Sequence, residues 1–302
     1  MSQINKSRSD IDEIRNLIQS FTPLNPSLWP DLWEQKPTNF FAHPRLSLFA
    51  GHHGFATSAP DSANDYVKKS VEGSSPINQL CSNANMDLRI YEMDMDGSTQ
   101  NCLEYGFALS EDEFAKTLAY GMMAVEPSLD LIATSALGNG TQNAAEAVCS
   151  IHGLKTKVSD ELLNKKLKDT VRTARGIDCL PLIGGYELSA LCGLIIAARL
   201  AEIPVLLEGV IGLSAIAILT HENKHACDHV ALTGHINPNS LTENDIDIAY
   251  LPMPIQIPLE TGICMAYLIP NLRSQIIIQE SLAADGGHDH GHACGSGCGH
   301  QH

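Results

Sequence analysis

The sequence predicts an α/β fold in which a mostly parallel sheet is covered by helices on both faces. Short apolar runs bounded by turns alternate with longer helix-like segments, as in βαβ units. The runs are continuously apolar, which is typical of strands buried on both faces of a parallel sheet. With 302 residues, 44% of them hydrophobic, the chain can form one large domain, or one domain with a small lobe.

The expected helices follow from apolar spacing and from N-cap residues. Residues 9–21 predict an amphipathic helix, since their Ile, Leu and Phe residues fall near one face. Ser110 and Glu113 have the spacing of a capping box at the start of a helix over residues 110–124. Two further helices are expected, at 160–175 with leucines on one side, and at 187–202, which is apolar nearly all round and therefore buried.

Residues 22–44 are rich in Pro, Trp and Asn and predict an irregular connection. The body of the chain then contains the predicted strands. They are residues 46–50, 88–93, 129–134, 204–208 and 247–251.

Composition excludes several classes of protein. Nineteen Lys and Arg against 35 Asp and Glu give a net charge of −16, which argues against a nucleic-acid polymer as partner. The chain has no uninterrupted apolar run of about 18 residues, so no membrane span is expected. The first residues lack the apolar region of a secretory signal. Seven of the nine cysteines are scattered singly through an apolar body, as buried thiols in a reducing, cytoplasmic compartment would be.

The last residues, 285–302, differ from the rest of the chain in composition. They read DGGHDHGHACGSGCGHQH, are rich in glycine and predict a disordered tail. Imidazole and thiolate are ligands that zinc, cobalt, nickel and copper prefer, so the tail predicts loose binding of a divalent transition metal. The alternative is a low-complexity tail or a purification artefact. The candidate ligands are His288, His290, His292, Cys294, Cys298, His300 and His302.

Glycine-rich turns are the candidate places for chemistry, because ligands in parallel sheets bind beyond the carboxyl ends of the strands. Glycine lets the backbone approach a ligand closely, and a following helix start offers N–H groups to a phosphate or carboxylate. The alternative is turn geometry alone. The turns are residues 51–54 (GHHG), 136–141 (ALGNGT), 184–187 (GGYE, at the start of the buried helix) and 208–209 (EG).

Three titratable residues near these turns have two interpretations each. His52 and His53 are adjacent, so at most one is expected to face a site, and either could be solvent-facing or bonded in the core. Glu260 precedes a helical run (ICMAYLI) and is either a general base or an acid favoured at a helix start.

Taken together, the turns resemble the nicotinate-nucleotide–dimethylbenzimidazole phosphoribosyltransferase family. FAGHHG at 49–54 looks like the family's A-D-H-G turn, and ALGNGTQNAA at 136–145 looks like its E-(M/L)-G-x-G-N-T-T-x-A turn. GGYE at 184–187 looks like its G-G-F-(D/E) helix start. VLLEG at 205–209, followed by Ser214-Ala215, looks like its V-(L/V)-(L/V)-D-G-F strand and turn. The segment from Gln256 to Gly262 looks like its R-L-G-E-G-(S/T)-G-A segment.

The resemblance implies a doubly wound, Rossmann-like α/β domain with a small helical lobe, usually a homodimer. It implies transfer of phosphoribose from nicotinate mononucleotide to an aromatic azole, giving an α-ribotide for cobalamin lower-ligand assembly, with no cofactor required. By this resemblance Glu260, one place after the family's glutamate position, is the candidate catalytic base, and a lysine within 165–168 is expected to add positive charge near the phosphate. The substrate and phosphate site is assigned to His53, Gly138, Gly140, Thr141, Gly184, Gly185 and Glu208.

Three positions depart from the family pattern. Leu259 stands where an ungapped alignment puts the catalytic glutamate, Ala136 replaces a second glutamate, and His52 replaces the aspartate of A-D-H-G. The alternative function is therefore a catalytically altered or inactive homologue that acts as a metal-linked carrier or regulator binding a nucleotide or azole.

The predicted organisation has three parts. They are residues 1–44, the N-terminal helix and connection belonging to the small lobe; residues 45–284, the phosphoribosyltransferase-like α/β domain; and the tail, residues 285–302.

Overall fold

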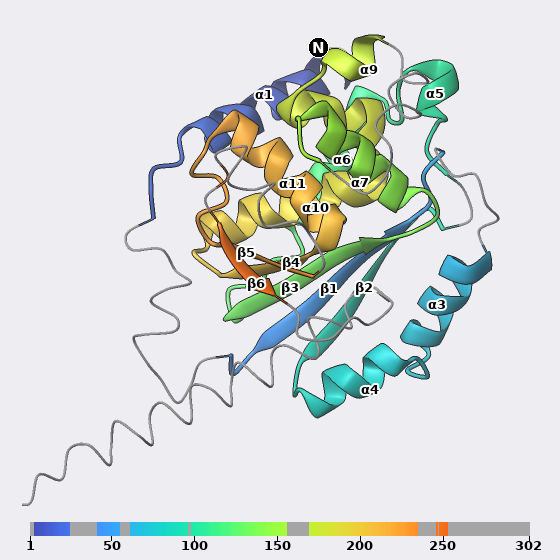
Figure 1. Ribbon diagram of the computed structural model, residues 1–302, viewed down its shortest axis with the longest axis vertical. Helices are drawn as coiled ribbons and strands as arrows, with labels where there is room; N and C mark the ends of the chain where they lie inside the picture. The colour runs from blue at the N-terminus through green and yellow to red at the C-terminus, as the bar shows by residue number, and fades with distance from the viewer. Residues whose placement is uncertain are drawn as a thin grey trace, which may run out of the picture.

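The structure is a computed structural model that describes residues 3–24, 41–54, 61–95, 98–155, 169–234, 246 and 248–252. Its strands form one sheet in the order β2-β1-β3-β4-β5-β6, and every pair of neighbours runs parallel (Figure 1). The predicted fold class, α/β with a mostly parallel sheet, is confirmed. The strands are β1 (Pro44–Gly51), β2 (Asp87–Met93), β3 (Leu131–Leu137), β4 (Val205–Glu208), β5 (Val230–Gly234) and β6 (Ala249–Pro252).

Helices cover both faces of the sheet, because alternate side chains of each strand point to opposite faces. The connection from β1 to β2 contains α3 (Asp61–Val71) and α4 (Pro76–Asn83), which lie below the sheet in Figure 1. On that face Leu46 and Leu48 of β1 belong to one apolar cluster with Ile77 of α4. Phe49 points the other way and belongs to the larger cluster on the opposite face.

The larger layer of helices covers the opposite face (Figure 1). A 3-10 turn, η1 (Gly176–Cys179), and a π-helical turn, η2 (Leu180–Gly184), lead directly into α10, the most buried of these helices. The helices of this layer are α1 (Gln3–Gln19), α5 (Cys102–Tyr105), α6 (Glu111–Met122), α7 (Thr141–Ile151), α9 (Asp169–Thr173), α10 (Gly185–Leu200) and α11 (Gly209–Glu222).

Helices α6 and α10 approach each other closely through a reciprocal pair of glycines. A Cβ placed on Gly121 of α6 would lie 1.9 Å from the Ala190 carbonyl oxygen of α10. A Cβ placed on Gly193 of α10 would lie 2.1 Å from the Leu118 carbonyl oxygen of α6. Each helix therefore packs directly on the backbone of the other, which only glycine permits at these two positions.

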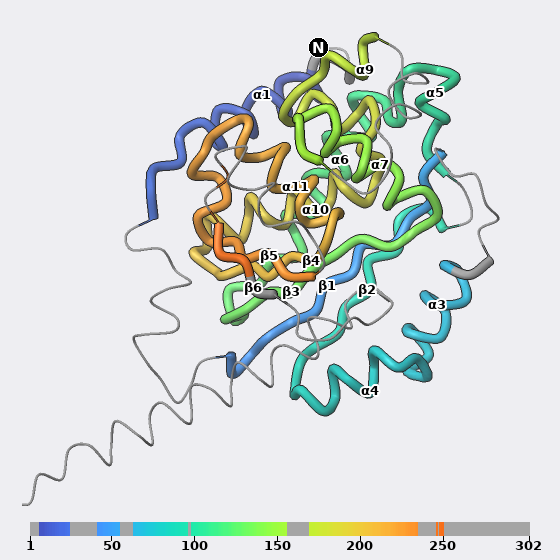
Figure 2. Tube along the Cα trace, viewed as in Figure 1, coloured from blue at the N-terminus to red at the C-terminus, as the bar shows by residue number. Residues whose placement is uncertain are grey.

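The N-terminal helix α1 packs against α6 and α11, and the trace in Figure 2 shows it beside both. Its Arg15 forms an ion pair with Asp178 of η1, and the Arg15 Nε lies 3.6 Å from Glu222 Oε2 at the end of α11. These contacts connect the first helix to segments more than 150 residues away in the sequence.

Several element boundaries differ from the predictions. Helix α1 begins at Gln3, not at residue 9. Strand β3 runs to Leu137, so Ala136 belongs to the strand and not to the turn. The third glycine turn follows η2, not a strand, because the chain enters α10 through a helical turn. Helices α3 and α4 and strand β5 are not among the predicted elements. Of the helix predicted at 160–175, the structure describes residues 169–175, where α9 lies.

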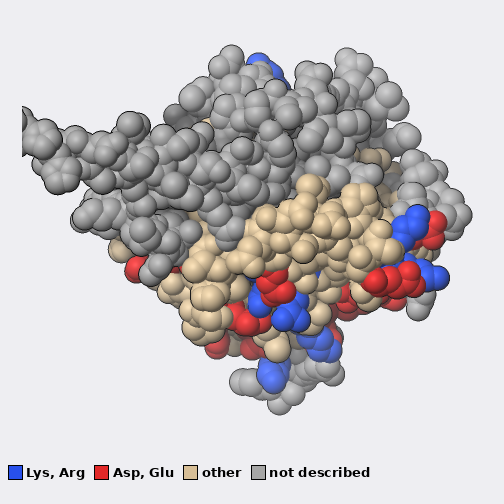
Figure 3. Space-filling view, turned by 90° about the horizontal axis from the view of Figure 1, so that it is seen from below, with Lys and Arg blue, Asp and Glu red and all other residues tan. Residues whose placement is uncertain are grey.

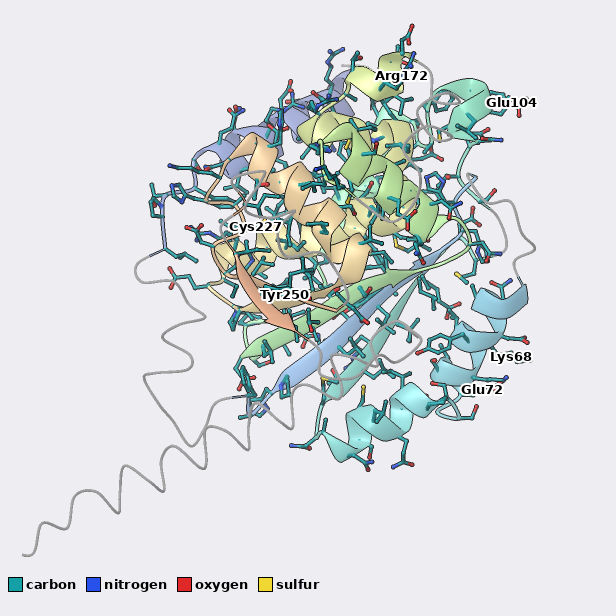
Figure 4. All side chains as sticks on the ribbon, in the orientation of Figure 1. Lys68, Glu72, Glu104, Arg172, Cys227 and Tyr250 are labelled. Atoms are coloured by element: carbon teal, nitrogen blue, oxygen red, sulfur yellow. The ribbon has the colours of Figure 1, made fainter. Side chains whose placement is uncertain are left out.

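Other predictions concern side chains. The capping box at Ser110 and Glu113 is confirmed, since each side chain bonds the other residue's backbone N–H. The edge strand β6 is held by Tyr250, labelled in Figure 4, whose hydroxyl donates to the Gly234 carbonyl oxygen at 2.6 Å. The cysteines that the structure describes are buried free thiols, as predicted: Cys81, Cys102, Cys149, Cys179, Cys192 and Cys227.

On the face seen in Figure 3, several of the described Lys and Arg side chains lie beside Asp and Glu. Arg45 shows how such groups pair. Its guanidinium is largely buried and donates to Asp87 at 2.8 Å and to Glu126 at 2.7 Å. Its charge is therefore compensated at the start of β1, at the opposite end of the strand from the glycine turn.

Candidate active site

The candidate site lies where the strand order reverses direction. From β1 the chain crosses to β2 on one side, whereas from β3 it crosses to β4 on the other. In open parallel sheets the loops at such a point diverge and leave a crevice beyond the carboxyl ends of the two strands. Two of the predicted glycine turns, residues 51–54 and 136–141, occupy this point after β1 and β3.

The turns after β1 and β3 are in direct contact. A Cβ on Gly138 would lie 1.5 Å from the Gly51 carbonyl oxygen, so no other residue fits at position 138 without moving a backbone. The His53 N–H donates to the Asn139 carbonyl oxygen at 2.9 Å. In return, the Asn139 N–H donates to His52 Nδ1 at 3.3 Å. The backbones of the two turns therefore hold each other in one arrangement.

Both histidines after β1 are almost fully buried, with exposed fractions of 4% for His52 and 0% for His53. Because His52 Nδ1 accepts the Asn139 N–H, its Nε2 is the protonated nitrogen, and it donates to Asn64 Oδ1 of α3 at 2.7 Å. The neutral His52 ring thus connects the two turns to α3, which lies on the other face of the sheet from α7.

His53 connects the same turn to α10. Its Nε2–H donates to the Ile183 carbonyl oxygen at 2.8 Å, at the end of η2. Burial lowers the pKa of His53 to about 4, so the ring is neutral at physiological pH. The structure thus gives His53 a bonding partner within the protein, and its assignment to the substrate stays a prediction.

Helix α7 begins at the turn after β3. Gly140 is its N-cap residue with a φ of 83°, and Thr141 is its first residue. Among the described residues, no side chain caps this helix start. The first N–H groups of a helix have no partner within the helix and carry a partial positive charge, which suits an anion. Gly138, Gly140 and Thr141, all predicted site residues, therefore lie together at one helix start.

Glu187 joins this arrangement from α10. Its side chain is fully buried, and its Oε1 accepts a hydrogen bond from Thr141 Oγ1 at 2.6 Å. Burial raises the pKa of Glu187 to about 7, against the lowering effect of that bond. Its Oε2 is buried and has no hydrogen-bond partner among the described residues.

The start of α10 requires glycine for the same kind of close contact. Gly185 has a φ of 69°, and a Cβ there would lie 2.5 Å from His53 Cδ2 and 3.0 Å from Glu187 Oε2. Gly184, which precedes it, ends the π-helical turn. The structure therefore brings the turn at 184–187 to the turns after β1 and β3.

Glu208 lies at the same edge of the sheet, at the end of β4, with 6% of its surface exposed. Gly209 follows with a φ of 56°. A Cβ on Gly234, at the end of β5, would lie 3.2 Å from the Gly209 N atom. The fourth predicted turn is thus packed against the end of the next strand.

Other predicted residues lie outside the described residues. Among them are Glu260 and Leu259, the lysines within 165–168, and the whole predicted metal set: His288, His290, His292, Cys294, Cys298, His300 and His302. Within the residues that are described, no group of three or more His, Cys, Asp or Glu side chains could hold a metal ion.

Glu187 is a site residue that was not predicted from the sequence. It belongs to the predicted turn at 184–187, but it was not among the predicted site residues. The sequence does contain a signal, because Glu187 is the one charged side chain among residues 185–198 of α10. A lone acid in a buried helix requires a partner or a shifted pKa.

Comparison with known proteins decides the family. The family model described as phosphoribosyltransferase (DBI_PRT) matches residues 25–242, most of the chain and all of the glycine turns. The chain belongs to this family. As a member of the phosphoribosyltransferase family it is a transferase, and the enzyme prediction is confirmed at that level.

Curated relatives agree with this assignment. The nicotinate-nucleotide–dimethylbenzimidazole phosphoribosyltransferase of Sinorhizobium fredii is 29% identical over 233 residues, which cover 70% of this chain and 68% of that protein. The enzyme of the same name from Brucella anthropi is 29% identical over 232 residues, covering 69% of this chain and 68% of its own.

Solved structures show the same fold. The crystal structure of the Thermus thermophilus phosphoribosyltransferase of that name has a TM-score of 0.65 at 18% identity and covers 90% of this chain and 96% of its own. A second crystal structure from that organism, titled CobT, has a TM-score of 0.61 at 19% identity, covering 93% of this chain and 96% of its own.

The apolar character of α10 does not indicate a membrane protein. The continuous helical segment Gly176–Leu200 is long and apolar enough to span a membrane, but 83% of its most apolar window is buried inside the protein. Among the described residues it is the core helix of a phosphoribosyltransferase fold.

Proposed function

We propose that this phosphoribosyltransferase transfers phosphoribose from nicotinate mononucleotide to a benzimidazole-type base and so makes an α-ribotide for cobalamin lower-ligand assembly. The observation that carries the proposal is the contact between the turns after β1 and β3, which presents the uncapped start of α7 at the switch point. The names of the curated relatives support the same substrates.

The backbone would bind the 5′-phosphate. The N–H groups of the first turn of α7 point out of the helix start, and the glycines at 138 and 140 leave no side chain in the way. His53 is neutral because burial lowers its pKa to about 4, so among the described residues of these turns the positive potential comes from backbone dipoles, to which we expect a lysine within 165–168 to add charge.

In the transfer, a ring nitrogen of the azole forms a bond to the anomeric carbon of the ribose. The bond from that carbon to the nicotinate nitrogen breaks on the opposite face, and nicotinate leaves with the electron pair. The azole loses its ring proton to a base, for which we propose Glu260. Holding both reactants in line replaces a bimolecular encounter by an intramolecular one.

The direct test is to incubate the purified full-length protein with nicotinate mononucleotide and 5,6-dimethylbenzimidazole. Chromatography with mass detection is expected to show α-ribazole phosphate and free nicotinate in equal amounts. A protein inert with this base, and with other azoles and phenols, would contradict the proposal and favour the non-catalytic alternative, a carrier or regulator.

The Glu260→Gln variant is expected to lower kcat by about 100-fold or more, the lower range for loss of a general base. Glutamine keeps the size of the side chain but cannot take the azole proton. The measurement is steady-state kinetics with both substrates varied. Glu72→Gln is the matched control, because Glu72 is exposed in the turn directly after α3 (Figure 4), and we expect it to keep wild-type kcat. Equal rates for Glu260→Gln and the control would remove Glu260 from the mechanism.

We also propose that the tail, residues 285–302, binds a divalent transition metal, supported by its density of His and Cys residues. Calorimetric titration with Zn²⁺ and with Co²⁺ is expected to show binding to the full-length chain that a truncation ending at residue 284 lacks. Equal binding by the two proteins would show that the tail is not the ligand. We propose that the transfer itself needs no metal, and we therefore expect equal kcat for the two.

Two further properties belong to the same proposal. We expect a homodimer, which sedimentation equilibrium would detect. The net charge of −16 argues against a nucleic-acid polymer as partner. The singly scattered cysteines support a cytoplasmic protein, and the lack of an uninterrupted apolar run of about 18 residues supports one without a membrane partner.

A further inference from the structure

Glu187 contacts each of the three segments that form the candidate site. Its Cγ lies 3.3 Å from the position of a Cβ on Gly51, in the turn after β1. Its Oε1 accepts a hydrogen bond from the hydroxyl group of Thr141, at the start of α7. Its Oε2 lies 3.0 Å from the position of a Cβ on Gly185, at the start of α10. Movement of any of these turns therefore changes the surroundings of this one carboxyl group.

Only one of the two oxygens of this buried carboxyl group accepts a hydrogen bond from a described side chain. A buried carboxylate normally accepts several hydrogen bonds, because each unpaired oxygen loses its hydration without compensation. Here Thr141 Oγ1 supplies one bond, and Oε2 has none among the described residues. The ionised form is thus poorly stabilised, and a proton on Oε2 would remove the uncompensated charge.

The titratable groups around Glu187 do not compensate its charge. His53, from the turn after β1, is neutral because burial holds its pKa at about 4. Tyr186 adjoins it on α10, and the Tyr186 hydroxyl donates to Glu113 of α6 at 3.2 Å. Glu146, further along α7, is itself acidic and accepts from Gln142. Burial dominates the resulting pKa of Glu187, which is about 7, so small changes in local charge alter its protonation at physiological pH.

Resting on the proposed function, we propose that Glu187 is a positioning residue that takes up one proton from solvent when the anionic nucleotide binds at the turn after β3. A phosphate dianion at the start of α7 lies beside Thr141, whose hydroxyl bonds Glu187 directly. Two negative charges so close in a poorly solvated region repel each other strongly. Protonation of Oε2 removes this repulsion, while Oε1 continues to accept from Thr141 and keeps the turn in place.

The test is calorimetric binding of nicotinate mononucleotide to the full-length protein at pH 8, in buffers of different ionisation enthalpy. At this pH the phosphate is already a dianion, since its second pKa is about 6, and Glu187 is mostly ionised. The wild type is expected to take up close to one proton per nucleotide bound. Glu187→Gln, a neutral isostere that still accepts from Thr141, is expected to take up none.

The affinity should change in parallel. Raising the pH from about 6.5 to 8.5 is expected to weaken nucleotide binding to the wild type about 25-fold more than binding to Glu187→Gln, since a carboxyl group with a pKa of about 7 falls from about three-quarters to about 3% protonated over this range. Glu146→Gln is the matched control, a buried acid on α7 with its own amide partner, and it should keep the wild-type proton uptake and pH dependence.

The outcomes separate the two proposals. Nucleotide binding with the same proton uptake in wild type and Glu187→Gln would overturn this inference and leave the proposed function standing. No nucleotide binding to the wild type would overturn both. If Glu187→Gln does not fold, difference infrared spectroscopy of the wild type decides. A carbonyl band of a protonated carboxylic acid should grow on nucleotide binding at pH 8, and its absence would overturn the inference.

Discussion

Replacing Gly138 with alanine is expected to abolish nucleotide binding and to lower the free energy of unfolding by about 3 kcal/mol, the upper end for overpacking. The new Cβ would lie 1.5 Å from the Gly51 carbonyl oxygen, and a backbone atom cannot rotate away as a side chain can. The turns after β1 and β3 must separate, which breaks the reciprocal bonds of His53 and Asn139 with the facing turn. The start of α7 then no longer lies at the end of β1.

Chemical denaturation and calorimetric nucleotide binding measure the two effects. Gly73→Ala is the matched control, because Gly73 has a φ of 78° but open space around a Cβ, in the turn between α3 and α4. It is expected to cost only about 1–2 kcal/mol, from the left-handed backbone alone, and to bind nucleotide like the wild type. A Gly138→Ala variant that binds nucleotide normally would contradict the role of this contact.

Replacing Gly193 with alanine is expected to destabilise the protein by about 2–3 kcal/mol, although alanine is the better helix former. Helix propensity alone would stabilise α10 by about 1 kcal/mol. The Cβ would lie 2.1 Å from the Leu118 carbonyl oxygen, however, and would push α6 away from α10. The sign of the change in the free energy of unfolding therefore shows whether helix propensity or the contact between α6 and α10 has the larger effect.

Thermal and urea denaturation give that sign. The matched control is Ala197→Val at a half-buried position of the same helix, which is expected to cost no more than about 0.7 kcal/mol through helix propensity. A Gly193→Ala variant with a raised free energy of unfolding would contradict the close contact between α6 and α10.

Features set by neighbouring residues could be predicted from the sequence. The capping box works through Ser110 and Glu113, three residues apart, so its pattern alone predicted the start of α6. The apolar runs of β1 and β4 are long enough to stand out. Strand β5 is not, since Val230, Ala231 and Leu232 make only a three-residue run, and pairing with β4 and β6 defines it as a strand.

Features set by distant contacts could not be predicted. The sequence indicated that glycines at 51, 138 and 185 belong to turns, but not that these turns touch. Glu187 is buried against residues far away in the chain, such as Gly51 and Thr141, and this burial raises its pKa; the sequence marks it as a lone acid in an apolar helix but does not show which segments surround it. The two histidines show the same limit, because each buried ring bonds a residue on a different element. His52 bonds Asn64 of α3, and His53 bonds Ile183 of η2.

The strand order has a consequence for how the chain folds. Central strand β1 pairs with β2 and β3, and each partner is reached only after an intervening helical connection. None of the observed strand pairs can form as a local hairpin, so each requires closure of a long loop first. We therefore expect refolding in milliseconds to seconds, not microseconds. During synthesis, β1 lacks its second partner until β3 has left the ribosome.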